Sequence, residues 1–228
     1  MNKFLVFCFF LSQGLWAQNT TDTAGNKQGL WTGYHKGTNN LRYEGSFKDN
    51  KEVGVFKYYD DTKAKVVIAT REFNAKDGSN YTIFYDQTGN VVSEGKIVNK
   101  EKEGVWKIYH KASKAVMSLE NYSKGKLVGE NKVFYKDGKI LEIRNFKDGV
   151  LNGLYSKYSV EGKLLEQYTY IDGKIQGEAT YYNTDGQVYS NGLYKDNARV
   201  GVWKFYKDGK VVKEVTQKPI IKFKNTVK

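Results

Sequence analysis

The sequence has almost no cysteine, the residue that cross-links many small proteins, and almost no proline. Its 228 residues include one cysteine, Cys8, and one proline, Pro219. We expect Cys8 to be removed with an N-terminal targeting segment, so a disulfide framework and thiolate chemistry are excluded from the rest of the chain. Strand pairing and aromatic packing must then hold the fold together.

Long apolar runs are also missing. The one clear run is eight residues long, at positions 4–11, with Lys3 before it and a plausible cleavage site after Ala17. Such a run is typical of a secretory signal and is too short to cross a membrane. We therefore predict a signal peptide at 1–17 and an exported mature chain, periplasmic or extracellular, with no transmembrane segment.

Sets of residues that carry chemistry are scarce as well. His35 and His110 have no partners at metal-ligand spacing, and no glycine-rich phosphate loop precedes a helical pattern. Repeated glutamates could form an acid–base pair, but on a repeat surface they more often pair with lysines across strands. We predict no enzyme, no cofactor and no metal. The glutamates in question are Glu94, Glu142, Glu166 and Glu214.

What the sequence does contain is a repeat of about 24 residues. Eight anchor positions recur at spacings of 24 to 26 residues, and the residue five places after each anchor is aromatic in every case. Self-similarity at such a period is typical of repeat architectures. The anchors are Gly29, Gly54, Asn80, Gly104, Gly129, Gly153, Gly177 and Gly201, and the aromatic residues are Tyr34, Tyr59, Tyr85, Tyr109, Phe134, Tyr158, Tyr182 and Tyr206.

Each unit has the pattern of a β-hairpin. A short extended run is followed by a glycine turn, a second extended run, and a turn such as Asp-Gly or Lys-Gly, whose residues supply the positive φ of tight hairpins. The runs alternate with a period of two, which puts Trp106 and Ile108 on one face and Val105, Lys107 and Tyr109 on the other. We predict an all-β fold without helices: an elongated, twisted, single-layer antiparallel β-meander of about eight hairpin repeats.

The repeat also sets the predicted boundaries. We expect a polar lead segment at 18–28, the repeat array at 29–214 and a basic C-terminal tail at 215–228, with the two flanking segments protecting the ends of the sheet. The units at Gly29 and Asn80 depart most from the pattern, because Gly33 precedes Tyr34 and Asn80 replaces the anchor glycine. These two units should be the least regular.

The units that begin at Gly104 (GVWKIY) and Gly201 (GVWKFYKDGK) resemble the bacterial variant of the MORN repeat. Repeats of this pattern are also found in proteins labelled as YwqK-like antitoxin components. The resemblance covers about 29–214 and implies an extended single-layer sheet. It also implies, from the label alone, an antitoxin role.

The chain is strongly basic. Lysine and arginine number 37 against 25 acidic residues, which gives a net charge of +12. Such a charge could favour nucleic acid, anionic lipid or a polyanionic glycan. The lysines are spread over turns and strands, however, and an exported chain would not meet nucleic acid. We predict no nucleic-acid partner, and anionic lipid or glycan stays open.

The aromatic residues have two candidate roles. The eight residues five places after the anchors should stack as a structural ladder on one face. Other rings, such as Trp106 and Trp203 on the opposite face, are equally typical of contact residues in protein interfaces and of the rings that a thin sheet must use to bury anything. The candidate partner-binding residues are Trp106, Trp203, Phe56, Tyr155 and Tyr181.

Together these features predict an exported, non-enzymatic repeat protein that binds a protein partner through a curved β-sheet surface. Two alternatives remain. One is an antitoxin or immunity protein that neutralises a toxin. The other is an envelope-associated structural protein that contacts anionic lipid or glycan through its lysines.

Overall fold

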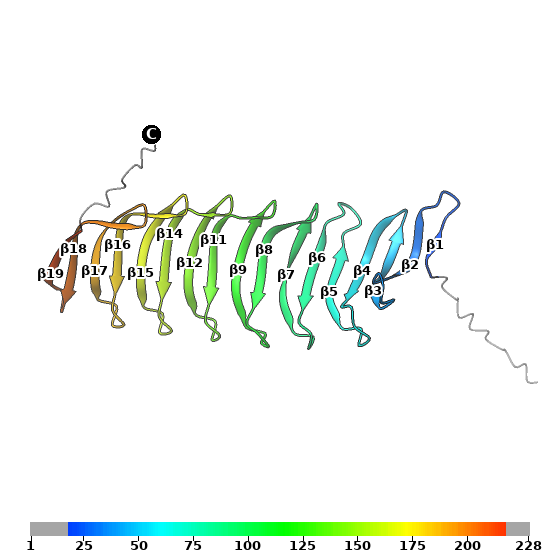
Figure 1. Cartoon of the computed structure of the whole chain (residues 1–228), viewed down its shortest axis with the longest axis horizontal. Helices are drawn as coiled ribbons and strands as arrows, with labels where there is room; N and C mark the ends of the chain where they lie inside the picture. The colour runs from blue at the N-terminus through cyan, green and yellow to red at the C-terminus, as the bar shows by residue number, and fades with distance from the viewer. Residues whose placement is uncertain (1–17, 218–228) are drawn as a thin grey trace, which may run out of the picture.

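The computed structural model describes residues 18–217, which form one open antiparallel sheet of 19 strands (Figure 1). Consecutive strands pair along the chain, so the sheet is an elongated β-meander, and the described residues contain no helix. The predicted fold class is confirmed. The strands are β1 (Thr20–Thr21), β2 (Lys27–Tyr34), β3 (Leu41–Lys48), β4 (Lys51–Tyr59), β5 (Val67–Phe73), β6 (Asn80–Tyr85), β7 (Val91–Val98), β8 (Glu101–Tyr109), β9 (Val116–Ser123), β10 (Lys126–Leu127), β11 (Gly129–Phe134), β12 (Ile140–Lys147), β13 (Val150–Leu151), β14 (Gly153–Tyr158), β15 (Leu164–Ile171), β16 (Lys174–Tyr182), β17 (Val188–Lys195), β18 (Ala198–Lys207) and β19 (Lys210–Gln217).

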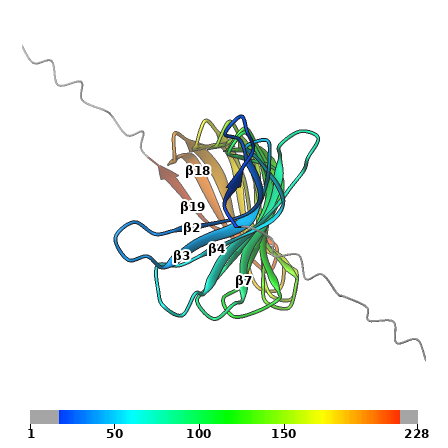
Figure 2. The same ribbon diagram turned by 90° about the vertical axis from the view of Figure 1, so that its right-hand side faces the viewer.

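Two bulges per unit shape the sheet. One register shift falls just before the aromatic residue at the end of a unit's first strand, as between Ile108 and Tyr109. The other falls where the first strand meets the preceding unit, near anchor glycines such as Gly54 and Gly104, whose φ angles are 68° and 71°. Bulges bend strands and increase their right-handed twist. When the sheet is viewed along its long axis, the strands at its two ends accordingly run at different angles (Figure 2).

The unit at Asn80 breaks this pattern. Strands β5 and β6 pair in straight register from Ala69↔Phe84 to Phe73↔Asn80, with no shift. A loop at 74–79 joins them, whereas β3 and β4 are joined by Asp49 and Asn50 alone. Without the anchor glycine, the second bulge is absent from this unit and the connection is longer.

The sheet extends beyond the predicted array at both ends. Strand β2 begins at Lys27, and β19 ends at Gln217. The predicted polar lead contributes β1, which pairs with β2 through Thr20↔Gln28 and Thr21↔Lys27. The predicted signal peptide and the tail from residue 218 onward lie outside the described residues. Within 18–217 there is no helix long and apolar enough to cross a membrane.

Candidate functional site

The residue two places after each anchor forms the core of the sheet. Phe56, Trp106 and Trp203 have no exposed surface, and Tyr155 is 8% exposed. We call the face that carries these side chains the ring face. The same row contains smaller buried residues in other units, namely Thr82, Asn131 and Ala179.

Three of these rings lie flat on a glycine of the preceding strand. A Cβ placed on Gly45 would come within 2.3 Å of the Phe56 ring, and one on Gly192 would come within 2.5 Å of Trp203. Gly95 makes the same close approach to Trp106. A single-layer sheet has no second layer to cover it, so the large rings themselves bury the neighbouring backbone.

Indole N–H groups and cations complete this packing. Trp106 Nε1 donates to the carbonyl oxygen of Lys96 at 3.0 Å, and Lys102 Nζ lies 4.4 Å from the Trp106 ring centroid. Trp203 makes the corresponding pair of contacts, and Arg199 lies 4.1 Å from its ring. Each polar atom is satisfied and each ring is covered, which is the environment of a core residue.

Because these rings are buried, most of the predicted partner-binding residues are not accessible to a partner. Trp106, Trp203 and Phe56 have no surface to offer a partner, and Tyr155 has almost none. Tyr181 is half-buried, with its ring 6.1 Å from that of Trp203. The sequence pattern placed rings on the strands correctly, but it left open whether Trp106 and Trp203 form a contact surface or the core of a sheet without a second layer. A partner must contact other residues.

The opposite face carries the aromatic residues five places after the anchors. Tyr59 Oη donates to Glu44 at 2.7 Å, and Tyr109 Oη donates to Glu94 at 2.6 Å. Lys107 reaches the same Glu94 carboxylate at 3.4 Å. We call this the lysine face, because lysines alternate with buried rings along its strands. They are Lys57, Lys107, Lys132 and Lys204.

The expected aromatic ladder is not a stack of rings. None of the ring–ring contacts within 18–217 joins two members of the row. Successive members lie two strands apart, and several use the hydroxyl to bind the strand between them. Tyr34 is exposed, Tyr59 is buried, and the half-buried members are Tyr85, Tyr109, Phe134, Tyr158, Tyr182 and Tyr206.

Tyrosine–glutamate contacts shift the titration of both groups. Partial burial, followed by the hydrogen bond to the carboxylate, raises the pKa of Tyr59 and of Tyr109 to about 12. The hydrogen bond from Tyr59 is the main cause that lowers the pKa of Glu44. These groups are therefore fixed in their ordinary charge states near neutral pH.

Sequence reasoning missed an exposed apolar row on the lysine face. The residue directly after the anchor is Val55, Val105, Leu154 and Val202 in four of the units, and these side chains are 45–55% exposed. We call these four residues the apolar row. Their neighbours at the next position are the buried rings, so strand alternation places these four residues on the opposite face.

Histidines and repeated glutamates have structural partners. His35 Nε2 lies 3.1 Å from the carbonyl oxygen of Tyr59, and His110 Nε2 lies 3.1 Å from that of Phe134. The part of the chain that is described contains no cluster of three potential metal ligands. Glutamates pair with nearby cations in Glu94–Lys107, Glu142–Arg144, Glu166–Lys157 and Glu214–Lys204.

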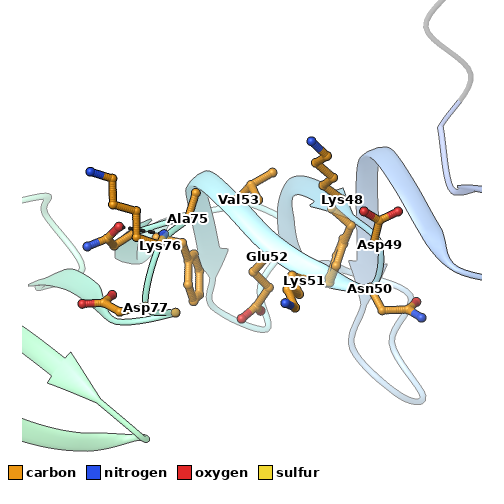
Figure 3. Close-up of a pocket in the computed structure, with 13 residues that line it drawn as sticks. Lys48, Asp49, Asn50, Lys51, Glu52, Val53, Ala75, Lys76 and Asp77 are labelled. Atoms are coloured by element: carbon orange, nitrogen blue, oxygen red, sulfur yellow. Dashed lines mark hydrogen bonds between the residues drawn. The ribbon is translucent and has the colours of Figure 1, made fainter.

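Two hollows lie beside the irregular unit. One, of about 780 Å³, lies between the β3–β4 turn and the β5–β6 loop (Figure 3). Glu52 stands between these two segments, with Lys48 on the turn and Lys76 on the loop. The other, of about 520 Å³, lies over β2–β5 on the ring face and shares Phe47 and Glu52 with the first.

These features define an open, single-layer β-repeat protein whose core lies on one face. Residues 127–148 and 175–196 match the family model of the MORN repeat variant. The resemblance seen in the sequence is thus confirmed at these two units. Among curated proteins, none matches the chain significantly.

Similarity to solved structures is weak. The Photorhabdus luminescens Tc holotoxin pore aligns at 12% identity and a TM-score of 0.21, covering 77% of this chain and 11% of that one. A Bacteroides fragilis protein of unknown function aligns at 11% identity and a TM-score of 0.13, covering 77% of this chain and 99% of that one. TM-scores this low carry no argument about function.

Proposed function

We propose that the chain is a non-enzymatic scaffold that binds a protein partner through the lysine face of its sheet. The observation that carries the proposal is the apolar row, which recurs in every second unit, at spacings of 48 to 50 residues. Exposed apolar side chains that line up on one surface are typical of interaction sites. A repeat presents them at regular intervals, which suits an extended partner.

The charged groups beside the row support the same role. Lys57 pairs with Glu44 at 3.2 Å, and Lys107 pairs with Glu94 at 3.4 Å. Exposed pairs of this kind contribute about 0–1 kcal/mol to stability. They are better suited to orient a partner around an apolar centre, as a polar rim does in many interfaces.

Family and sequence support the remaining parts of the proposal. MORN repeat variants are generally not enzymes, and proteins built from such repeats often bind proteins or membrane lipids. The apolar run at 4–11 favours export, so the partner would be met in the periplasm or outside the cell. Neutralisation of a toxin would be a special case, established if the partner proved to be a toxin.

Affinity capture tests the proposal. The full chain would be used to capture proteins from the native cell envelope at low and high salt, followed by mass spectrometry. We expect one protein to be retained at both salt concentrations, because an apolar contact persists when charges are screened. The double variant Val105→Asp with Val202→Asp should lose it.

A matched control uses an exposed valine outside the row. Val160 is 45% exposed and lies in a turn, so Val160→Asp should retain the partner. Equal loss with Val160→Asp would contradict the proposal. Retention that vanishes at high salt would contradict it as well and would favour an electrostatic contact with lipid or glycan.

A further inference from the structure

The hollow over β2–β5 has the dimensions of a ligand site. Its volume of about 520 Å³ falls within the roughly 300–1,000 Å³ of small-molecule sites. It lies on the ring face, whereas the apolar row lies on the lysine face. A ligand here would therefore be independent of the proposed protein partner.

The hollow lies next to the irregular unit. Straight pairing of β5 with β6 removes a bulge, and the loop at 74–79 is longer than the two-residue turns, such as 49–50 and 99–100, that join other units at the same edge of the sheet. The neighbouring turn at Lys48–Lys51 is separated from this loop, and Glu52 lies between the two segments (Figure 3). The hollow over β2–β5 continues from that gap through Phe47 and Glu52.

Three cationic side chains line the hollow, and each makes a cation–π contact with an aromatic ring. Lys27 Nζ lies 4.5 Å from the Trp31 ring centroid, and the Arg71 guanidinium carbon lies 4.8 Å from that of Tyr58. Arg42 lies 5.4 Å from the ring of Tyr43. Arg71 Nε is buried and has no hydrogen-bond partner. None of the ion pairs within 18–217 involves Lys27, Arg42 or Arg71, so their positive charge is available to an anionic ligand.

One carboxylate, Glu52, lines the same hollow, so its formal charge is +2 from three cations and one anion. Partial burial raises the pKa of Glu52, and Arg71 and Lys27 oppose that shift. A carboxylate at this place repels a doubly charged phosphate but accepts hydrogen bonds from hydroxyl groups. The half-buried rings of Tyr43 and Tyr58 lie beside it, beneath the guanidinium groups of Arg42 and Arg71.

We propose that this hollow binds a sugar residue that carries a carboxylate, such as a uronic acid. Its carboxylate would lie against Arg42 and Arg71, and its hydroxyls would donate to Glu52. Arginine suits this task because its planar fork matches a carboxylate. A phosphate would be repelled by Glu52 and would leave this carboxylate without a role.

Calorimetric titration of the full chain with trigalacturonic acid tests this proposal, with galactotriose as the neutral counterpart. We expect saturable binding of the acidic trisaccharide only. Arg42→Ala should weaken it about tenfold, the effect of losing one charge-assisted hydrogen bond. Arg71→Gln should weaken it at least as much, and thermal unfolding would establish that the variant is folded.

Arg199→Ala is the matched control. Arg199 is also exposed and also lies over rings, those of Trp203 and Tyr181, but it lines no part of this hollow. Affinity should stay within twofold. Equal binding of the neutral sugar, equal weakening by Arg199→Ala or no saturable binding at millimolar ligand would overturn the proposal. Tighter binding of tetraglutamate would overturn it in favour of an acidic peptide.

Discussion

The two ends of the ring face share one packing scheme and differ in what surrounds it. At one end Phe56 covers Gly45, and at the other Trp203 covers Gly192. The Trp203 end continues into the regular pair β18–β19, whereas the Phe56 end is followed by the straight-register unit at Asn80. The hollows flank the Phe56 end. The regular repeat provides stability, whereas the larger hollows lie beside the unit that departs from the repeat.

The largest effect should follow from removing either central ring. Phe56→Ala and Trp203→Ala should each destabilise the protein by about 3–5 kcal/mol, because both rings are fully buried. Each unit contacts only its neighbours, so the loss should spread little. Hydrogen exchange should show faster opening of β3–β5 in the first variant and of β17–β19 in the second. Uniform opening of the whole sheet in both would contradict this locality.

A Cβ added beneath the rings should have the next largest effect. Gly45→Ala and Gly192→Ala should each cost about 1–3 kcal/mol, because the added atom would overlap the ring above it. Chemical denaturation measures the loss. Gly192→Ala should cost much less in a Trp203→Leu background, since the flat ring is then gone. An unchanged cost in that background would show that overlap with the ring is not the cause.

Asn80 makes a side-chain hydrogen bond in the irregular unit, at the place where the regular units have the anchor-glycine bulge. Its Oδ1 accepts a 2.6 Å hydrogen bond from the buried hydroxyl of Thr82. Asn80→Ala should cost about 1–3 kcal/mol, because that hydroxyl would lose its acceptor. Thr82→Val removes the hydroxyl, so the double variant should cost less than the sum of the two single variants. Additive losses in thermal unfolding would contradict this coupling.

The smallest effect concerns the lysine face, where the two regions should behave alike. Tyr59 and Tyr109 each have a pKa raised to about 12, first by partial burial and then by Glu44 or Glu94. Their contribution to stability is full below pH 10 and is lost as the pH rises towards 12. Absorbance titration of tyrosinate should show Glu44→Gln and Glu94→Gln lowering the respective pKa towards 10. A lowered tyrosine pKa in only one of the two variants would show that the two regions also differ on the lysine face.

Much of the fold was predictable because the sequence pattern repeats in every unit. The aromatic residues from Tyr34 to Tyr206 fixed the unit length, and strand alternation placed Trp106 and Val105 on opposite faces. Alternation could not tell which face is buried, since a single layer has no inside defined by a second layer. The rings of Trp106 and Trp203 were therefore predicted as suited to a partner as well as to the core, while the exposed valines beside them were overlooked.

The hollow was only partly predictable. The replacement of the anchor glycine by Asn80 signalled an irregular unit, and that unit is indeed irregular. The cations of the hollow lie on three different strands, at Lys27, Arg42 and Arg71. Their convergence depends on register and on ring contacts, which a list of charges along one chain does not contain.

The most direct test of the link between the irregular unit and a binding site is hydrogen exchange of the full chain with and without trigalacturonic acid. We expect slower exchange in β2–β6 and no change in β16–β19. Equal protection at both ends would contradict it, because the Trp203 end shares the rings and an arginine but lacks the irregular unit. Absence of protection in β2–β6 would contradict it as well.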